Sequence, residues 1–144
     1  MKKITALVLT LMLVVCVFAS CGGGSESKSE NYVDVTVKFV AEGKEFYSKE
    51  VTVNADDPTV LMAVQEIYYN STDIEIGFDN EENPTTVSSI NDYAEGESYW
   101  DFKIGDDSYG SNGRAVNAKI KDGDVITWGY MTLDEFKALD QPEA

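Results

Sequence analysis

Cys21 is the residue whose neighbours point most directly to chemistry. The segment Phe18-Ala19-Ser20-Cys21 places small residues before it and follows two lysines and an apolar run over residues 4–19. A positive, then apolar, then small-residue order is typical of a secretory signal. The residues around Cys21 resemble the bacterial lipobox, whose cysteine is diacylated on sulfur and becomes the new N-terminus. We therefore expect residues 1–20 to be a lipoprotein signal peptide and Cys21 to be the lipidation site.

This interpretation has three alternatives. Cleavage before Cys16 is disfavoured because Val15, which precedes it, is large. An ordinary signal peptide with an incidental cysteine and a plain transmembrane helix are the others, although the apolar run is short for a bilayer span. Each buried methylene contributes about 0.8 kcal/mol, so the two acyl chains on Cys21 suffice for stable anchoring. We expect a protein tethered to the extracytoplasmic face of the cell membrane.

The charge of the chain limits its partners. Removing residues 1–20 leaves 124 of 144 residues and takes away two lysines and no acidic residue, so the formal charge of −15 becomes −17. Such an acidic domain repels nucleic acid and anionic lipid head groups. We expect no nucleic-acid partner, and the membrane is reached only through the lipid.

The residues for catalysis are few. The chain has no histidine, Cys16 leaves with the signal, and the sulfur of Cys21 is consumed by lipid. There is no Gly-x-Ser-x-Gly elbow, phosphate loop or diagnostic serine–lysine spacing. Two carboxylates facing each other across a groove could hydrolyse a glycoside, but a domain of this size seldom has such a groove. We predict that the protein is not an enzyme and has no catalytic residues.

Acidic side chains gather in three loops and could in principle hold calcium, which prefers oxygen ligands. The clusters are Asp79 with Glu81 and Glu82, Asp106 with Asp107, and Asp122 with Asp124. None matches a calcium loop, because Pro84 stands where a glycine is required. Solvated acidic surface is the preferred interpretation, with no metal site and calcium as the alternative.

The elements that position these residues begin after a flexible tether over residues 21–31. Residues 33–39 and 45–53 alternate between apolar and polar types, which predicts a hairpin. Asp57-Pro58 is a typical helix start, with Asp57 as the cap. The predicted helix has one apolar face that should lie across the hairpin, formed by Val60, Leu61, Val64, Ile67 and Tyr68.

Further strands are predicted over residues 74–78, 86–90, 99–104 and 125–130. The folded domain covers residues 32–131, and the tail over 132–144 carries a short helix capped by Thr132. This order is typical of an α+β fold in which a mixed sheet packs on one main helix. We predict a β-grasp (ubiquitin-like) plan.

The aromatic residues divide into two groups. Trp100, Phe102, Trp128 and Tyr130 alternate along their strands, which indicates core rather than ligand contacts. Tyr93, Tyr99 and Tyr109 fall on the other face or in loops, so they are the predicted ligand-binding residues. The alternative for these three tyrosines is ordinary loop packing.

Three segments in order are similar to the transcobalamin-like C-terminal domain, a family that includes many bacterial surface lipoproteins. The first combines residues 35–39 and 49–53 of the hairpin with the helix start Thr59-Val60-Leu61. The second is Tyr99-Trp100-Asp101-Phe102, and the third is residues 121–130, Lys-Asp-Gly-Asp-Val-Ile-Thr-Trp-Gly-Tyr. The family often has an Asn-Gly turn after its Tyr-Trp strand, where this chain has Gly105-Asp106-Asp107. The resemblance implies a binding or accessory lipoprotein without a resident cofactor, for cobalamin, another corrinoid or an exported partner protein. The alternative is a module that binds protein or cell wall and no small molecule.

Overall fold

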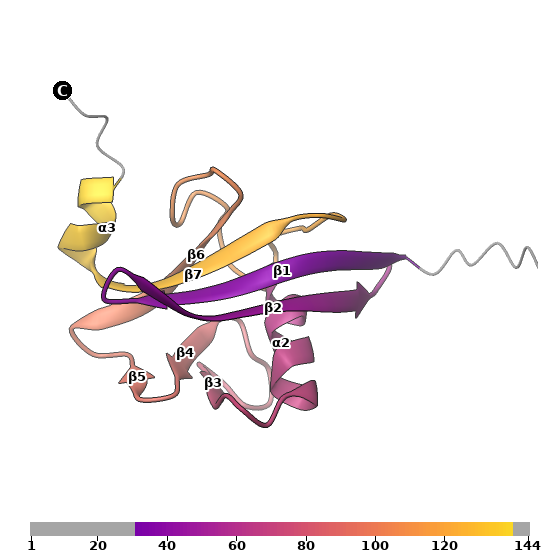
Figure 1. Ribbon diagram of the computed structural model, residues 1–144, viewed down its shortest axis with the longest axis horizontal. Coiled ribbons are helices and arrows are strands. Elements are labelled where there is room, and N and C mark those ends of the chain that lie inside the picture. Colours follow the sequence, from indigo (N-terminus) through magenta and orange to yellow (C-terminus); the bar gives the residue numbers. More distant parts are fainter. Residues whose placement is uncertain (1–30, 140–144) are drawn as a thin grey trace, which may run out of the picture.

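The larger of two sheets forms the centre of the computed structural model, which describes residues 31–139. Its strand order is β2-β1-β7-β6. The strands are β1 (Tyr32–Ala41), β2 (Lys44–Asn54), β6 (Ser98–Ile104) and β7 (Val125–Thr132). β1 and β7 run parallel in the middle, and β2 and β6 pair antiparallel at the two edges. The sheet is therefore mixed (Figure 1).

The main helix and a small antiparallel sheet lie on one side of the larger sheet (Figure 1). The helix is α2 (Val60–Asn70), and the small sheet has the order β3-β4-β5. Its strands are β3 (Ile76–Phe78), β4 (Val87–Ile90) and β5 (Tyr93–Ala94), and a second helix, α3 (Leu133–Leu139), ends the described part. The α+β class and the mixed sheet packed on one main helix are confirmed. The narrower β-grasp assignment stays a prediction.

The first hairpin follows its alternating sequence. Val35, Val37 and Phe39 are buried on the face toward α2, beside Val51 and Val53 of β2. Glu42 and Gly43 form the turn, and both have positive φ (53° and 73°), as a two-residue loop with the twist of the strands requires. The helix lies across this hairpin as predicted, with five apolar residues buried, Val60, Leu61, Ala63, Val64 and Ile67.

The alternating aromatics of β6 and β7 form the core. Trp100, Phe102 and Trp128 are 4%, 2% and 0% exposed, and the ring centroids of Phe102 and Trp128 lie 5.0 Å apart. Tyr130 is partly buried, and its hydroxyl donates to the carbonyl oxygen of Ala94 at 2.5 Å. The prediction that these four residues are structural is confirmed.

The prediction that Asp57 caps the main helix is wrong. Thr59 is the N-cap, and its Oγ1 accepts a hydrogen bond from the Met62 amide at 3.4 Å. Asp57 lies before the helix and forms an ion pair with Lys119. The hydroxyl of Thr59 therefore takes the capping role that the sequence pattern assigned to the carboxylate.

The loop that precedes β7 explains this shift. The amides of Val60 and Leu61 donate to the carbonyl oxygens of Ala118 and Ala115, at 2.9 and 3.0 Å. These amides belong to the first turn of the helix, where no partner exists within the helix itself. A segment more than fifty residues away in the sequence thus supplies the acceptors, which a local pattern around Asp57 does not reveal.

The short helix of the C-terminal tail is present and is packed on the sheet. Thr132 caps it as predicted: the Glu135 amide donates to Thr132 Oγ1 at 3.3 Å, and the Thr132 amide donates to Glu135 Oε2 at 2.7 Å. This reciprocal pair is a capping box. The amide and then the hydroxyl of Thr132 lower the pKa of Glu135, against a smaller opposing effect of burial. Phe136 is 5% exposed and lies against Tyr99 and Tyr109, so it fastens α3 to the sheet.

We expect Phe136→Ala to unfold α3 locally and leave the rest of the domain folded. The helix has seven residues, fewer than the roughly 12–15 that an isolated helix needs in water, so its stability depends on this contact. Hydrogen exchange should show loss of amide protection over residues 135–139. Leu133→Ala, which changes a side chain that is 51% exposed, is the matched control and should keep that protection. Unchanged protection in Phe136→Ala would show that another contact holds the helix.

Most of the predicted membrane-directed segment lies outside the described residues. The predicted signal peptide over 1–20, Cys21 and the tether up to residue 30 make up this part. Residues 140–144 of the C-terminal tail also lie outside the described residues. Among the helices of residues 31–139, none has the length and apolar character needed to cross a bilayer.

Candidate functional site

Tyr99 and Tyr109 lie together on the face of the main sheet opposite α2. Their ring centroids are 5.0 and 5.3 Å from that of Phe136. Tyr109 crosses over Gly129, where a β-carbon would stand 3.0 Å from the tyrosine ring. Burial, and then the negative charge of Asp101, raises the pKa of both tyrosines. These contacts give both rings a packing role.

Tyr93 lies on the other face of the sheet. Its ring centroid is 5.5 Å from that of Phe46 and 5.4 Å from that of Tyr130, and its carbonyl oxygen accepts from Trp100 Nε1 at 2.9 Å. The structure therefore does not bring the three predicted ligand-binding tyrosines into one site. Two share a cluster around Phe136, and the third belongs to the aromatic cluster beside β5.

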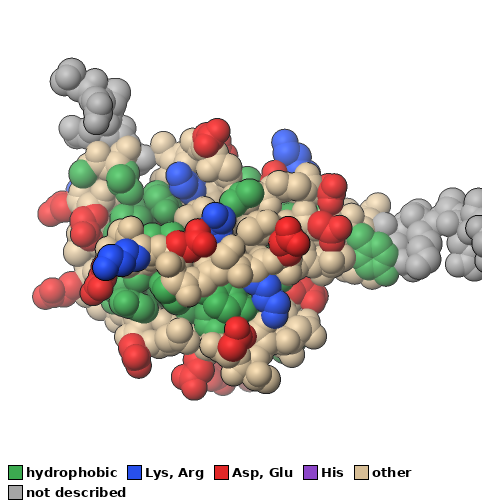
Figure 2. Space-filling model, in the orientation of Figure 1, with side chains coloured by type: hydrophobic (Ala, Val, Ile, Leu, Met, Phe, Trp, Pro, Cys, Tyr) green, Lys and Arg blue, Asp and Glu red, His purple; other side chains and the backbone are tan. Residues whose placement is uncertain are grey.

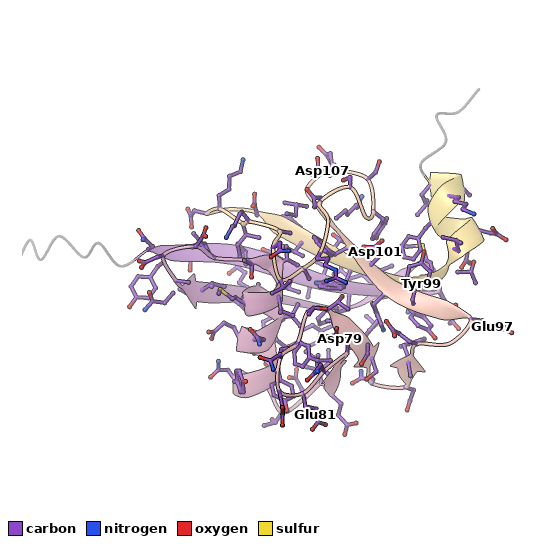
Figure 3. All side chains as sticks on the ribbon, turned by 180° about the vertical axis from the view of Figure 1, so that it is seen from behind. Asp79, Glu81, Glu97, Tyr99, Asp101 and Asp107 are labelled. Carbon is purple, nitrogen blue, oxygen red and sulfur yellow. The ribbon has the colours of Figure 1, made fainter. Side chains whose placement is uncertain are left out.

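The three acidic loops are also separate. Figure 3 shows Asp79 and Glu81 on the side of the sheet that carries α2, and Asp107 on the opposite side. Asp122 Oδ1 accepts from the Asp34 amide, and Asp124 Oδ2 accepts from the Lys121 amide, each at 2.9 Å. Within residues 31–139, no three acidic side chains are grouped so that they could hold a metal ion. Asp122 and Asp124 act as acceptors that close a turn.

Asp79 organises the loop between β3 and β4. Its Oδ1 accepts from the amides of Thr85 (2.8 Å) and Thr86 (3.1 Å), and its Oδ2 accepts from the Thr85 hydroxyl at 2.6 Å. Burial raises the pKa of Asp79, but the hydrogen bonds from Thr85, Thr86 and the Asn80 amide outweigh it and lower the pKa from 3.8 to about 2. The loop is therefore closed by a carboxylate that stays ionised.

We expect Asp79→Ala to cost about 1 kcal/mol of unfolding free energy, the range for loss of a side-chain cap. Asp79→Asn should cost less, because its amide oxygen still accepts from the two backbone amides that Oδ1 serves. The pKa of Asp79 is lower in the folded state, so its contribution is complete above about pH 4 and is lost as the pH falls toward 2. Denaturant unfolding at pH 6 and pH 2.5 measures this contribution. The decrease in unfolding free energy between the two pH values should be smaller in Asp79→Asn than in the natural chain. An equal pH dependence in both proteins would contradict it.

A cleft of about 500 Å³ opens between α2, β3 and the loop that Asp79 closes. We call it the Tyr68–Tyr69 cleft. The helix contributes the two tyrosines, β3 contributes Gly77 and Phe78, and the loop contributes Glu81 and Glu82. Hydrogen bonds between Asp79 and Thr85 join the two ends of the loop and hold the backbone that carries the two glutamates. The cleft is therefore built by the end of the helix, a strand and an ordered loop.

The aromatic walls of this cleft are open to solvent. Tyr68 is 47% exposed and Tyr69 is 73% exposed. The ring centroid of Tyr68 is 5.0 Å from that of Tyr69 and 5.4 Å from that of Phe78, with ring planes inclined at 74° and 71°. The prediction that Tyr68 belongs to the buried face of the helix is wrong, because this residue lies at the edge of the face where the small sheet begins.

A second hollow, of about 650 Å³, runs along the outer side of β1 and β2. Asp34, Glu50 and Asp122 are among its lining residues. Asp34 Oδ1 already accepts from the Thr52 hydroxyl at 2.6 Å, and Asp122 accepts from the Asp34 amide. Its lining contains no aromatic ring. Small-molecule sites are lined mainly by apolar and aromatic side chains, so the Tyr68–Tyr69 cleft is the better candidate.

The sequence contains a weak signal for this cleft. Two adjacent tyrosines at the end of an amphipathic helix cannot both point to its apolar face, because neighbours on a helix diverge by about 100°. Helix geometry therefore predicts that one of the two tyrosines, here Tyr69, is exposed. What the pattern does not reveal is the loop over residues 79–84, which lies against the helix only in the folded structure.

Comparisons with known proteins find little. No family model matches the chain, and no curated protein matches it. Among solved structures, it is similar to a "putative metal binding protein" from Ruminococcus gnavus, with 9% sequence identity and a TM-score of 0.41. The likeness covers 69% of this chain and 97% of that chain. A likeness this weak carries no functional information.

Proposed function

We propose that this chain is a lipid-anchored binding protein of the extracytoplasmic membrane face, without catalytic activity, that holds its ligand in the Tyr68–Tyr69 cleft. One observation supports the site above the others: two tyrosines that are 47% and 73% exposed stand beside a cleft of about 500 Å³. Exposed aromatic side chains around a cleft of this size are typical of small-molecule sites. The anchor is supported by the lipobox-like segment before Cys21.

A small-molecule ligand is also consistent with how the cleft is supported. The helix that carries both tyrosines is fixed by its buried face, including Val64 and Ile67, each 0% exposed. The backbone of the loop that carries the two glutamates is held by the hydrogen bonds of Asp79. A site on supported elements loses little conformational entropy when it binds, so more of the contact energy becomes affinity.

The resemblance to the transcobalamin-like domain makes cobalamin or another corrinoid, or a partner protein that carries one, the first ligand to test. The test is calorimetric titration of the mature chain with Cys21→Ser, which removes only the acylated sulfur, against cobalamin and cobinamide. We expect binding that Tyr69→Ala weakens at least about tenfold. No heat at high micromolar ligand would rule out direct corrinoid binding.

A second candidate function is protein or cell-wall interaction through the edge of the main sheet. Among the strands of residues 31–139, β2 has a neighbour on one side only, and it is eleven residues long, so its other edge could pair with a strand of another protein. Alternating charges at Lys49 and Glu50 oppose such pairing. This observation places the interaction module second. Mapping of ligand-induced resonance shifts separates the two, because a strand partner would perturb residues 44–54 and not Tyr69.

A further inference from the structure

We propose that the Tyr68–Tyr69 cleft selects a small organic cation, recognised through an alkylated ammonium group. This inference rests on the proposed function, since it names the chemical class of the ligand for the same cleft. Three features carry it: the geometry of the rings, the charge of the lining residues, and the exclusion of other ligand classes by the same contacts.

The ring geometry fits a cation better than a flat molecule. Tyr68 stands at 74° to Tyr69 and at 71° to Phe78, with centroid separations of 5.0 and 5.4 Å. Rings at nearly right angles form a corner, and in a corner two electron-rich faces can lie toward one positive group. Such corners of aromatic rings bind quaternary ammonium ligands, because the face of each ring carries negative charge density. Two parallel rings would instead favour stacking.

The charge of the cleft is entirely negative. Among the described residues, Glu81 and Glu82 line it, and no lysine or arginine does. The ion pairs Lys38–Glu45 and Lys119–Asp57 involve none of the residues that line the cleft. Figure 2 shows acidic side chains spread over one face of the domain around fewer basic ones, so the surrounding field also attracts cations.

Other ligand classes fit less well. An anion would meet two carboxylates and a domain of formal charge −17 after loss of the signal. A bare metal ion needs several oxygen ligands in one place, and no such group of acidic side chains exists within the described range of 31–139. A neutral apolar molecule would use the rings but leave Glu81 and Glu82 without a partner. An alkylated ammonium group uses the rings and the carboxylates together.

The test compares choline with 3,3-dimethylbutan-1-ol, a neutral molecule of the same shape with carbon in place of nitrogen. Both are titrated into the isotope-labelled mature chain carrying Cys21→Ser, and amide resonances are followed. We expect choline to shift the resonances of Tyr68, Tyr69, Phe78 and residues 81–84, and the neutral molecule to bind about tenfold more weakly or not at all. Raising the salt concentration should weaken choline binding.

Variants with matched controls separate the contributions of rings and charge. Tyr69→Ala should weaken choline binding about tenfold, whereas Tyr32→Ala, at a ring that is 46% exposed on β1, should not change it. The double variant Glu81→Gln with Glu82→Gln should weaken it several-fold, whereas Glu97→Gln, far from Glu81 in Figure 3, should not. Tyr69 and both glutamates are exposed, so these variants should fold normally.

The outcomes distinguish this inference from the proposed function. Equal binding of choline and its neutral analogue would overturn the proposal that the cleft selects a cation. Shifts of the same resonances by cobinamide but not by choline also overturn it, while leaving the cleft as the ligand site. No shift by any of these ligands contradicts both proposals. An added arm with phosphatidylcholine vesicles tells a lipid head group from a free ligand: shifts by either one support an ammonium ligand.

Discussion

A Cys21→Ser variant is expected to incorporate no labelled fatty acid when it is expressed in a bacterial host. The thiol of Cys21 is the predicted acyl acceptor, and a serine hydroxyl at that position does not replace it. The effect should be complete rather than partial, because the other cysteine, Cys16, follows the large Val15 and so does not fit the pattern of small residues before an acylated cysteine. The measurement is metabolic labelling with a fatty-acid analogue, followed by detection on the purified chain.

Cys16→Ser is the matched control and should be labelled like the natural chain. It makes the same chemical change five residues away, inside the predicted signal. Labelling of Cys21→Ser together with loss of label in Cys16→Ser would move the anchor to Cys16. Absence of label in the natural chain would contradict lipidation altogether, and the tethered location with it.

Trp128→Ala is expected to lower the free energy of unfolding by about 3–5 kcal/mol, the range for deletion of a large core aromatic. Trp128 is 0% exposed and lies in β7, the strand that joins β1 to β6 in the middle of the sheet. A small domain has only about 5–15 kcal/mol in total, so this variant should be close to unfolded at 37 °C. Denaturant unfolding followed by far-UV circular dichroism measures the loss.

Two milder variants test how the indole hydrogen bonds of the two tryptophans contribute to stability. Trp128 Nε1 is buried without a hydrogen-bond partner within residues 31–139, whereas Trp100 Nε1 donates to the Tyr93 carbonyl oxygen at 2.9 Å. Trp100→Phe removes that bond and leaves an acceptor unpaired, while Trp128→Phe removes an unpaired donor. Trp128→Phe should therefore cost less than Trp100→Phe, although both lose the same volume. The reverse order would contradict this account of the two tryptophans.

Elements with a strong local pattern could be predicted from the sequence. The alternation in β1, β2, β6 and β7 identified buried and exposed faces, because successive side chains in a strand point to opposite sides. The sequence pattern predicts one half of the capping box of α3, the cap Thr132, but not the contribution of Glu135. Such signals act within a few residues and do not depend on the rest of the fold.

Elements that depend on contacts distant in the sequence could not be predicted from it. The local pattern of Asp57-Pro58 predicts Asp57 as the cap, and this prediction is wrong because the first amides of α2 find their acceptors in residues 115–118, far away in the sequence. β5 has only two residues, Tyr93 and Ala94, and is held by pairing with β4 and by the bond from Trp100. Neither is visible in a local pattern.

The candidate site was the least predictable part. Tyr93, Tyr99 and Tyr109 were selected for lying off the core face, but a short helix carrying Phe136 covers two of them and an aromatic cluster holds the third. The Tyr68–Tyr69 cleft arises where the loop closed by Asp79 lies against the end of α2. Only the three-dimensional arrangement brings those segments together.

The most direct test of the account is the mass of the N-terminal peptide of the protein isolated from its native membrane. We predict a peptide that begins at Cys21, lacks residues 1–20 and carries a diacylglycerol on the sulfur. A free thiol at Cys21, or a peptide that still contains residues 1–20, would contradict the proposal of a lipid-anchored binding protein.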